Sequence, residues 1–261
     1  MYEKNFLQDK VALVTGGGTG IGMEIAIDFA EVGAKIVIAG RRDDILKKSS
    51  ERLKKITPYV LYVKTDIRNK EEVTNLFEKA VNKFGRIDIL VNNAGGQFIA
   101  NFEKISANGL DSVVKTNLYG TWFCCQEALK YMKSKGGKIV NIVHIYAIRA
   151  APGLAHSGAA RAGVINLTKS LALELAKYKI NVNAVAPGVT STEGFKEEMI
   201  KNKKMMQELE ETIPLHRFAK TKEIADLVIF LSSSAADFIT GQVIAIDGGQ
   251  VLGNWPDFTK L

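Results

Sequence analysis

Short apolar runs recur at regular intervals along the chain, and the segments between them have the periodicity of amphipathic helices. The runs cover residues 10–16, 34–40, 60–66, 88–95, 138–145, 180–188 and 241–249. Between two of them, KEEVTNLFEKAVNKF (70–84) places apolar side chains at steps of three and four, which indicates a helix with one buried face. Alternation of this kind predicts an α/β fold in which a seven-stranded, doubly wound parallel sheet is flanked by helices.

The composition favours one domain and argues against several classes of partner. The 261 residues contain no Pro- or Ser-rich linker, internal repeat or low-complexity segment, so we expect a single domain spanning 1–261. The net charge of +7 is spread over presumed helix surfaces, which argues against a nucleic-acid partner. Such a charge suits a ligand with several phosphates, although a solvated lysine-rich surface explains most of it.

The sequence also contains no pattern typical of a membrane helix, a signal peptide or a metal site. No apolar run approaches the roughly 18 residues of a membrane helix, and MYEKNFLQDK (1–10) is too polar for a signal peptide. Cys124 and Cys125 are adjacent, which makes them poor disulfide partners, and no Cys/His spacing indicates a metal site. We therefore expect a reducing, cytoplasmic location, no membrane and no metal. The C-terminal TKL only resembles a peroxisomal Ser-Lys-Leu signal.

A glycine-rich motif, TGGGTGIG (15–22), directly follows the first apolar run and opens a helix. Glycines here permit a tight turn, close approach of the backbone to a pyrophosphate and close helix–strand packing, while the helix start offers amide donors to the anion. The motif predicts a dinucleotide site, for which the candidate residues are Gly16, Gly18, Thr19, Gly20, Ile21 and Gly22.

The second apolar run ends in AGRRDD (39–44), where binders of the non-phosphorylated cofactor usually place an acid. Arg41 and Arg42 instead offer guanidinium groups to a ribose 2′-phosphate. The alternative is that one or both face solvent, with Asp43 or Asp44 nearby. We predict NADP(H) as the cofactor.

Four motifs in this order, TGGGTGIG, NNAG (92–95), KTNLYGT (115–121) and APG (186–188), resemble the short-chain dehydrogenase/reductase superfamily from about residue 10 to 249. The resemblance implies a Rossmann-type domain in which Asp66 lies near the adenine, Asn92 stabilises the central strand and Thr190 meets the nicotinamide amide. From the residues alone, Asn92 and Asn93 are equally well explained as strand-end hydrogen-bonding groups. The resemblance adds these cofactor candidates: Asp66, Ile67, Asn93, Ala94, Gly95, Arg161, Pro187, Gly188, Val189 and Thr190.

The chain departs from that superfamily at three of its four usual catalytic positions. Asn117 matches, whereas His144 replaces the usual Ser, Ser157 the usual Tyr and Arg161 the usual Lys. A serine hydroxyl is a poor general acid, and a guanidinium cannot relay a proton as an ammonium can. Carbonyl reduction through the ordinary tyrosine is therefore disfavoured.

Three segments of the sequence resemble a narrower branch of the superfamily, the NADPH-dependent, peroxisomal-type trans-2-enoyl-CoA reductases. They are NNAGGQF (92–98), HSGAARAGV (156–164) and NWPDF (254–258). The related 2,4-dienoyl-CoA reductases carry their catalytic Tyr fifteen residues before the Lys. Tyr146 stands fifteen residues before Arg161, so the chain mixes the two patterns.

We expect Tyr146 to be the acid that donates to a developing enolate oxygen, together with Asn117 or Tyr119, while Arg161 adds positive charge. Alternate residues of a strand share a face, so His144 and Tyr146 both reach the site if the strand stays regular. The alternatives are a packed aromatic for Tyr146 and a structural role for His144 in place of proton donation. For Ser157, which we take to orient the substrate, the alternative is a helix cap.

The segment 190–212 occupies the place of a variable substrate loop, with Phe195, Met199, Met205 and Met206 as candidates for an acyl-chain wall and Lys196, Lys201, Lys203 and Lys204 for CoA phosphates. Core packing and a solvated helix face are the alternatives. The resemblance also implies a homo-dimer or homo-tetramer whose interface uses the helices at 103–134 and 156–176. Taken together, the expected activity is NADPH-dependent reduction of a 2-enoyl-CoA or 2,4-dienoyl-CoA thioester. The alternatives are oxidoreduction of a non-CoA carbonyl or alcohol, and an idle NADPH-binding protein.

Overall fold

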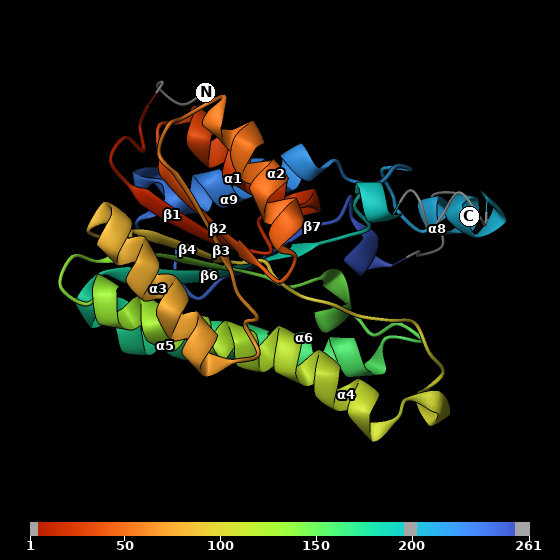
Figure 1. Ribbon diagram of the computed structural model, residues 1–261. Helices are drawn as coiled ribbons and strands as arrows, with labels where there is room; N and C mark the ends of the chain where they lie inside the picture. Colours follow the sequence, from red (N-terminus) through yellow and green to blue (C-terminus); the bar gives the residue numbers. More distant parts are fainter. Residues whose placement is uncertain (1–4, 196–202, 254–261) are drawn as a thin grey trace.

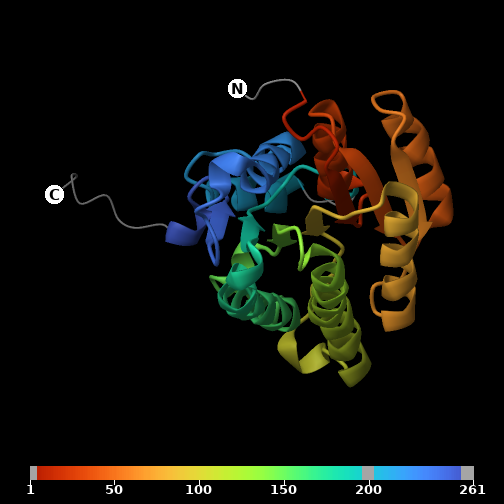
Figure 2. The same ribbon diagram turned by 90° about the vertical axis from the view of Figure 1, so that its left-hand side faces the viewer.

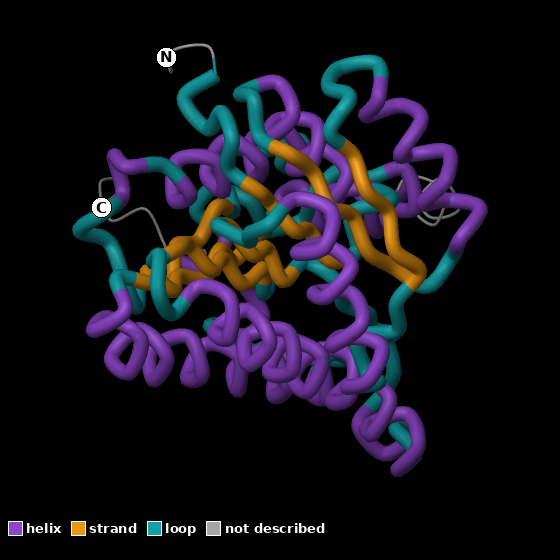
Figure 3. The backbone as a smooth tube through the Cα atoms, turned by 60° about the vertical axis from the view of Figure 1, so that its left-hand side comes forward, coloured by secondary structure: helices purple, strands orange, loops and turns teal. Residues whose placement is uncertain are grey.

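The computed structural model describes residues 5–195 and 203–253, which form one twisted parallel sheet between two layers of helices (Figures 1 and 3). The strands lie in the order β3-β2-β1-β4-β5-β6-β7. They are β1 (Val11–Thr15), β2 (Lys35–Gly40), β3 (Val60–Lys64), β4 (Ile89–Asn92), β5 (Gly137–Ile142), β6 (Ile180–Pro187) and β7 (Val243–Ile246). The predicted seven-stranded, doubly wound α/β fold is confirmed.

Helices cover both faces of the sheet (Figure 2). On one face lie α1 (Gly20–Glu31), α2 (Asp43–Lys54) and α9 (Thr221–Ser232); on the other lie α3 (Lys70–Phe84), α5 (Gly120–Met132) and α6 (Ala155–Leu175). Two further α-helices are α4 (Ala107–Val114) and α8 (Lys203–Glu211). All five residues of β1 are buried because helices shield the central strands from water on both sides, which accounts for their continuous apolar runs. No helix of the described residues is long and apolar enough to span a membrane.

The direction of winding reverses between β1 and β4, which are neighbours in the sheet but far apart in sequence. Crossovers leave such a point in opposite directions, so a crevice opens at the carboxyl ends of the strands. Buried amides tie this edge together: Asn92 Nδ2 donates to Asn141 Oδ1 at 2.8 Å, and Asn141 Nδ2 donates to Thr168 Oγ1 at 2.9 Å. Asn92 thus links β4 through β5 to α6, as expected.

Helix positions agree with the periodicity, and the helix between β3 and β4 has the predicted limits, 70–84. The Asn69 side chain accepts the Glu72 amide at its start, and Gly85, with φ of 76°, ends it. The region 103–134, expected as one helix, is divided into a 3₁₀ turn, α4, a π-helical turn at Lys115–Tyr119 (η2) and α5.

The fifth strand is shorter than the predicted 138–145, because it ends at Ile142. The last bond of its ladder with β6 runs from Val143 N to Val185 O at 2.8 Å. The next residue of β6 that faces β5 is Pro187, which has no N–H to continue the ladder. The chain then turns into a short 3₁₀ helix, η3 (Ile145–Ala147). The strand therefore does not stay regular as far as Tyr146, which was the condition for His144 and Tyr146 to share one face.

Candidate active site

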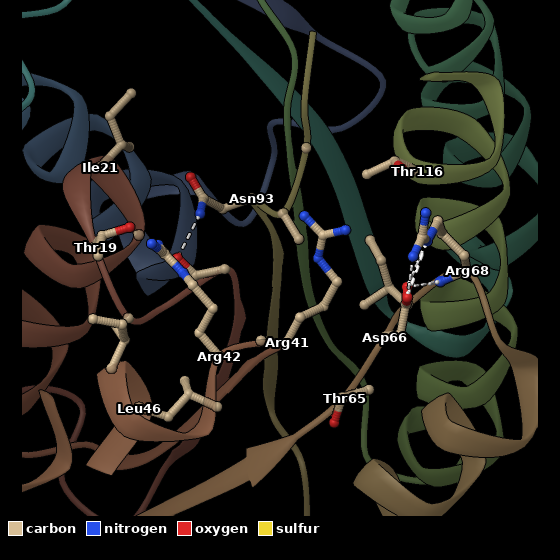
Figure 4. A pocket seen from close by; sticks show the side chains of 18 of the residues that line it. Thr19, Ile21, Arg41, Arg42, Leu46, Thr65, Asp66, Arg68, Asn93 and Thr116 are labelled. Carbon is tan, nitrogen blue, oxygen red and sulfur yellow. Dashed lines mark hydrogen bonds and ion pairs between the residues drawn. The ribbon is translucent and has the colours of Figure 1, made fainter. Parts of the chain in front are cut away.

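A cavity of about 330 Å³ lies at the carboxyl ends of β1 to β4, where the sequence predicts the dinucleotide (Figure 4). Twelve of the predicted cofactor residues line it: Gly16, Gly18, Thr19, Ile21, Gly22, Arg41, Arg42, Asp66, Ile67, Asn93, Ala94 and Gly95. Gly20 borders a neighbouring cavity on the other side of the glycine-rich turn. The wall of the first cavity does not include Arg161 or residues 187–190.

The glycine-rich turn has no room for a side chain at Gly16 or Gly22. A Cβ on Gly22 would lie 2.3 Å from the carbonyl oxygen of Gly16, and one on Gly16, where φ is 65°, would lie 2.8 Å from Asn93 Nδ2. The Asn93 amide in turn donates to the Thr15 and Gly16 carbonyls at 3.0 and 3.2 Å. Backbone held this way leaves the start of α1 open towards the cavity, which fits the pyrophosphate of a dinucleotide.

Arginines surround the other end of the cavity (Figure 4). Arg41 and Arg42 extend into it from the end of β2, and within the described residues neither forms an ion pair. Arg68, which the sequence reasoning missed, donates through Nε to both Asp66 oxygens at 2.9 and 3.0 Å. These hydrogen bonds, with a further contribution from the charge of Arg41, lower the pKa of Asp66. The position of Arg68 two residues after Asp66 was the available signal.

Residues 187–190 lie beyond this cavity, at the end of β6. The Thr190 hydroxyl donates to the Gly188 carbonyl at 3.0 Å, and Thr190 forms an isolated bridge with Ala219. A Cβ on Gly188 would lie 2.8 Å from the Asp247 backbone. The predicted contact of Thr190 with the nicotinamide stays a prediction.

A second group of predicted residues meets where η3 lies against the first turn of α6. His144 Nε2 is 2.9 Å from Ser157 Oγ, and Ser157 donates its hydroxyl hydrogen to Gln97 Oε1 at 3.0 Å. His144 must therefore donate its own N–H to Ser157, which leaves Nδ1 without a partner. The ring centroids of His144 and Tyr146 are 5.7 Å apart. Residues from three segments of the chain are thus brought together.

The ionisation of these side chains follows from burial. Burial, with the charge of Arg161 adding to it, lowers the pKa of His144 to about 4, so the imidazole is neutral at pH 7. Because the His144 ring is neutral and donates its N–H to Ser157, this residue is better suited to position Ser157 than to donate a proton to a substrate. Burial also raises the pKa of Tyr146, opposed by Arg149 and by a hydrogen bond with Gln250, so this phenol keeps its proton. The helix-cap alternative for Ser157 is wrong, because α6 begins at Ala155 and no side chain caps it.

Arg161 lies at the floor of the site and is only 5% exposed. Its guanidinium covers Gly95 so closely that a Cβ there would be 1.9 Å from Nη2. No acidic side chain of the described residues pairs with it, and Nη1 has no hydrogen-bond partner. Burial lowers the pKa of Arg161 to about 10, so the group stays charged at neutral pH. The site therefore contains a buried positive charge that an anion would neutralise.

Asn117 is brought to the site, whereas Tyr119 is not. Asn117, in the π-helical turn, accepts from Gly96 N at 3.0 Å and donates to Gly96 O at 2.9 Å, so its amide holds the loop after β4. Tyr119 is 48% exposed and lines an apolar groove between α5 and α6. This placement gives no support to the expected catalytic role of Tyr119.

The candidate substrate segment is described in part. Phe195 packs edge-on against Phe218, with ring centroids 5.4 Å apart, and Met205 is 44% exposed on α8. Met206 is half-buried, and Lys203 and Lys204 are exposed. Three of the candidates (Met199, Lys196 and Lys201) and the motif NWPDF lie outside the described residues.

Unpaired polar atoms also occur at this site. Within the described residues, eight buried side-chain nitrogens and oxygens have no hydrogen-bond partner. Two of the eight belong to side chains of this site, His144 Nδ1 and Arg161 Nη1. Such atoms are costly to bury without a partner, and a bound ligand would supply one.

The sequence matches a family described as Enoyl-(Acyl carrier protein) reductase over residues 16–250. The chain belongs to this family of short-chain dehydrogenases/reductases. It is 36% identical over 253 residues to a probable 2,4-dienoyl-CoA reductase of Bacillus subtilis, covering 96% of this chain and 100% of that protein. It is 39% identical to a 3-oxoacyl-(acyl-carrier-protein) reductase of Thermotoga maritima, covering 94% and 99%. A crystal structure of a short chain dehydrogenase from Bacillus anthracis aligns with a TM-score of 0.90 at 40% identity, covering 97% and 100%.

Membership makes the chain an oxidoreductase that binds a nicotinamide cofactor, and the residues present fit such a group. The crowded glycine-rich turn, the open start of α1 and the cavity beside Asp66 supply a cradle for a dinucleotide.

Proposed function

We propose that the protein uses NADPH to reduce the conjugated double bond of a 2-enoyl-CoA or 2,4-dienoyl-CoA thioester. The observation that carries this proposal is the position of His144, which lies 2.9 Å from Ser157 Oγ and has its ring centroid 5.7 Å from that of Tyr146. A phenol from η3 thus stands close to the helix on which the family usually places its tyrosine. The resemblance to dienoyl-CoA reductases supports it.

The cofactor, when bound, supplies a hydride to the β-carbon of an enoyl or the δ-carbon of a dienoyl thioester. Negative charge then develops on the thioester oxygen, and the protonated Tyr146 donates a hydrogen bond to it. Arg161 adds a fixed positive charge, while Ser157, held by His144 and Gln97, orients the thioester. Water then protonates the α-carbon, so that one hydride and one proton are added across the conjugated system.

Arg41 and Arg42 support the proposal that the cofactor carries a 2′-phosphate. They line the cavity and form no ion pair with the residues that the structure describes, and Arg68 pairs with the acid that lines the same cavity, Asp66. Two uncompensated guanidinium groups suit a 2′-phosphate and would gain little from a plain ribose hydroxyl.

The first experiment follows NADPH consumption with a trans-2-enoyl-CoA and a 2,4-dienoyl-CoA of equal length. Dienoyl turnover alone would show that Tyr146 decides the chemistry, and enoyl turnover would place the protein with the enoyl-CoA reductases. Tyr146→Phe is expected to lower kcat by roughly 10²- to 10⁴-fold with NADPH binding unchanged, as loss of a general acid does. Full activity in Tyr146→Phe would remove this residue from the mechanism.

A carbonyl substrate is the second candidate, because one relative is named a 3-oxoacyl-(acyl-carrier-protein) reductase. The Ser157 and Arg161 replacements argue against it, since neither side chain supplies the usual proton relay. Turnover of a 3-oxoacyl thioester or a simple ketone, without turnover of either conjugated thioester, would select this candidate. Tight NADPH binding without any turnover would select an idle binding protein.

We also propose a homo-oligomer in a reducing, cytoplasmic location. Both cysteines are free and buried. The groove between α5 and α6, with a volume of about 770 Å³, is lined largely by apolar side chains that include Trp122, Leu167 and Leu171. A second copy of the chain would cover it.

A further inference from the structure

The loop that follows β4 is fastened to the candidate active site on both sides of Gln97. Before it, Asn117 binds both the N–H and the carbonyl of Gly96, at 3.0 and 2.9 Å. After it, Phe98 packs on the first turn of α6, where its ring centroid lies 4.3 Å from that of His156. The backbone of Gln97 therefore has a fixed position beside α6.

The side chain of Gln97 takes up the only hydrogen that Ser157 can donate. Gln97 Oε1 accepts the Ser157 hydroxyl hydrogen at 3.0 Å, and Ser157 Oγ accepts the N–H of His144 Nε2 at 2.9 Å. A hydroxyl has one hydrogen, so Ser157 has none left for a substrate. What remains on Ser157 is a lone pair, which a thioester carbonyl oxygen cannot use because it is itself an acceptor.

The free donor at the end of this chain of hydrogen bonds is the Gln97 amide nitrogen. The amide is planar, so a bond that fixes Oε1 also fixes the direction of the NH₂ group. Gln97 is exposed, and Nε2 has no hydrogen-bond partner among the residues that the structure describes. Hydrogen bonds in a chain polarise one another, so the hydrogen received from Ser157 makes the Gln97 N–H a stronger donor.

The segment that carries Tyr146 packs against the same turn of α6. A Cβ on Gly158 would lie 2.9 Å from the Tyr146 carbonyl oxygen, and the ring centroids of Tyr146 and His144 are 5.7 Å apart. Two donors thus come to the surroundings of Ser157 from different segments, Gln97 from the loop after β4 and Tyr146 from η3. Sites that stabilise a developing oxyanion commonly use more than one donor.

We propose that Gln97, and not Ser157, supplies the second hydrogen-bond donor to the thioester carbonyl oxygen, beside Tyr146. The inference rests on the proposed reduction of a conjugated thioester. Ser157 and His144 act on the substrate through Gln97, because they fix the direction of its amide. The bond strengthens when the oxygen becomes an enolate, so it stabilises the transition state more than the bound substrate.

The direction of the hydrogen bonds is tested without substrate, by ¹⁵N NMR of protein labelled at its three histidines. The His144 signals are identified by their loss in His144→Asn. The ring hydrogen is expected on Nε2, because Ser157 gives its own hydrogen to Gln97. A ring hydrogen on Nδ1 would mean that Ser157 donates to His144 and that the Gln97 amide donates to Ser157, which would overturn the proposal.

A double-mutant cycle tests which side chain touches the substrate. In a wild type that reduces a conjugated thioester, Gln97→Met should lower kcat/KM by roughly 10²- to 10³-fold, the effect of removing one oxyanion donor. Ser157→Ala should lower it by about 10-fold, because the amide remains but is less well oriented. The double variant should match Gln97→Met within about 2-fold, since Ser157 acts through Gln97. Losses that multiply, or a larger loss in Ser157→Ala than in Gln97→Met, would overturn the proposal.

The matched control is Gln242→Met. Gln242 is exposed just before β7, at the opposite end of the sheet, and its amide bonds to the nearby Thr240 carbonyl. Its kcat/KM should stay within about 2-fold of the wild type. Equal losses in Gln242→Met and Gln97→Met would also overturn the proposal.

The contact itself is measured without turnover, by the infrared C=O stretch of a bound saturated acyl-CoA labelled with ¹³C at its thioester carbonyl. Hydrogen bonds lower this frequency, so it should rise in Gln97→Met and in Tyr146→Phe and stay unchanged in Gln242→Met. An unchanged stretch in Gln97→Met would overturn the contact alone. A wild type that binds this thioester and reduces neither conjugated substrate would overturn the proposed function, while the stretch would still decide the contact. A wild type that binds no acyl thioester would overturn both.

Discussion

The guanidinium of Arg161 leaves no space for a side chain at position 95. A methyl group at Gly95 would lie 1.9 Å from Nη2 and 2.9 Å from Asn117 Oδ1. Gly95→Ala should therefore displace Arg161 and lower kcat/KM by roughly 10- to 100-fold, the effect of a displacement of about 1 Å in an active site. Steady-state kinetics with the conjugated thioester that is turned over will measure it.

Gly96→Ala is the matched control, because a Cβ at Gly96 meets nothing within 4 Å. Its kcat/KM should stay within about 2-fold of the wild type. Equal losses in the two variants would contradict the assignment of Arg161, since they would show that the loop tolerates no alanine for reasons other than the guanidinium.

The choice between NADPH and NADH also depends on individual side chains. Replacing Arg41 and Arg42 by Ala should weaken NADPH binding by about 10- to 100-fold, since a charge-assisted hydrogen bond contributes about 1.5 to 3 kcal/mol. NADH binding should change little, because NADH has no 2′-phosphate. Cofactor fluorescence titration gives both dissociation constants without a substrate. The control is Lys47→Ala, because Lys47 is an exposed cation of α2 outside the cavity. If the variant without Arg41 and Arg42 lost NADH and NADPH affinity in the same proportion, the contact with the 2′-phosphate would be excluded.

Helices and strands were largely predictable, because their signals are local. The periodicity of 70–84 coincides with α3, and the parallel seven-stranded sheet follows from the β/α alternation. The end of β5 was not predictable from its own residues, because it depends on Pro187 in the neighbouring strand β6.

The candidate site was predictable where a motif is contiguous and not where contacts join distant segments. The glycine-rich turn and Arg41 follow from one stretch of sequence. In contrast, Gln97 and Ser157 are 60 residues apart, and Gln250 reaches Thr212 across 38 residues. No periodicity or motif reports such pairs, because they arise only when the sheet brings the ends of β4, β5 and β7 together.

At the element scale, the contact between α1 and α9 contains a carboxylate that is costly to ionise. Burial raises the pKa of Asp28 to about 6, although Lys222 bonds to it at 3.1 Å. Between the unfolded pKa of 3.8 and the folded pKa of about 6, the folded state binds more protons than the unfolded state. The Asp28 contribution to the free energy of unfolding is therefore greatest below pH 4 and falls as the pH rises through 6.

Asp28→Asn should remove that dependence. Relative to the wild type, the variant should gain stability between pH 4 and pH 8, by on the order of 1 to 3 kcal/mol. Urea denaturation at the two pH values measures the difference. Asp226→Asn, an exposed partner of the same lysine, is the control. A stability difference between Asp28→Asn and the wild type that is independent of pH would contradict the raised pKa.

At the scale of the whole molecule, the α5–α6 face carries an apolar groove that bears on assembly. Tyr119 and Trp122 are 48% and 47% exposed and line the groove of about 770 Å³ with Leu167 and Leu171. Contiguous exposed apolar patches of this kind mark interaction sites. Arg161 lies on α6, and Asn117 lies in η2 directly before α5, so assembly through this face would also stiffen the site.

Trp122→Asp is therefore expected to dissociate the assembly, because each copy would bury an unpaired charge in the interface. Light scattering after size exclusion should give a dimer or tetramer for the wild type and a smaller species for the variant. Phe238→Asp, which charges a fully exposed aromatic after α9, should leave the mass unchanged. A monomeric wild type at micromolar concentration, or an unaltered mass in Trp122→Asp with native circular dichroism, would show that this face is not the interface. A dissociated variant that also loses turnover would show that the floor of the site depends on the second copy.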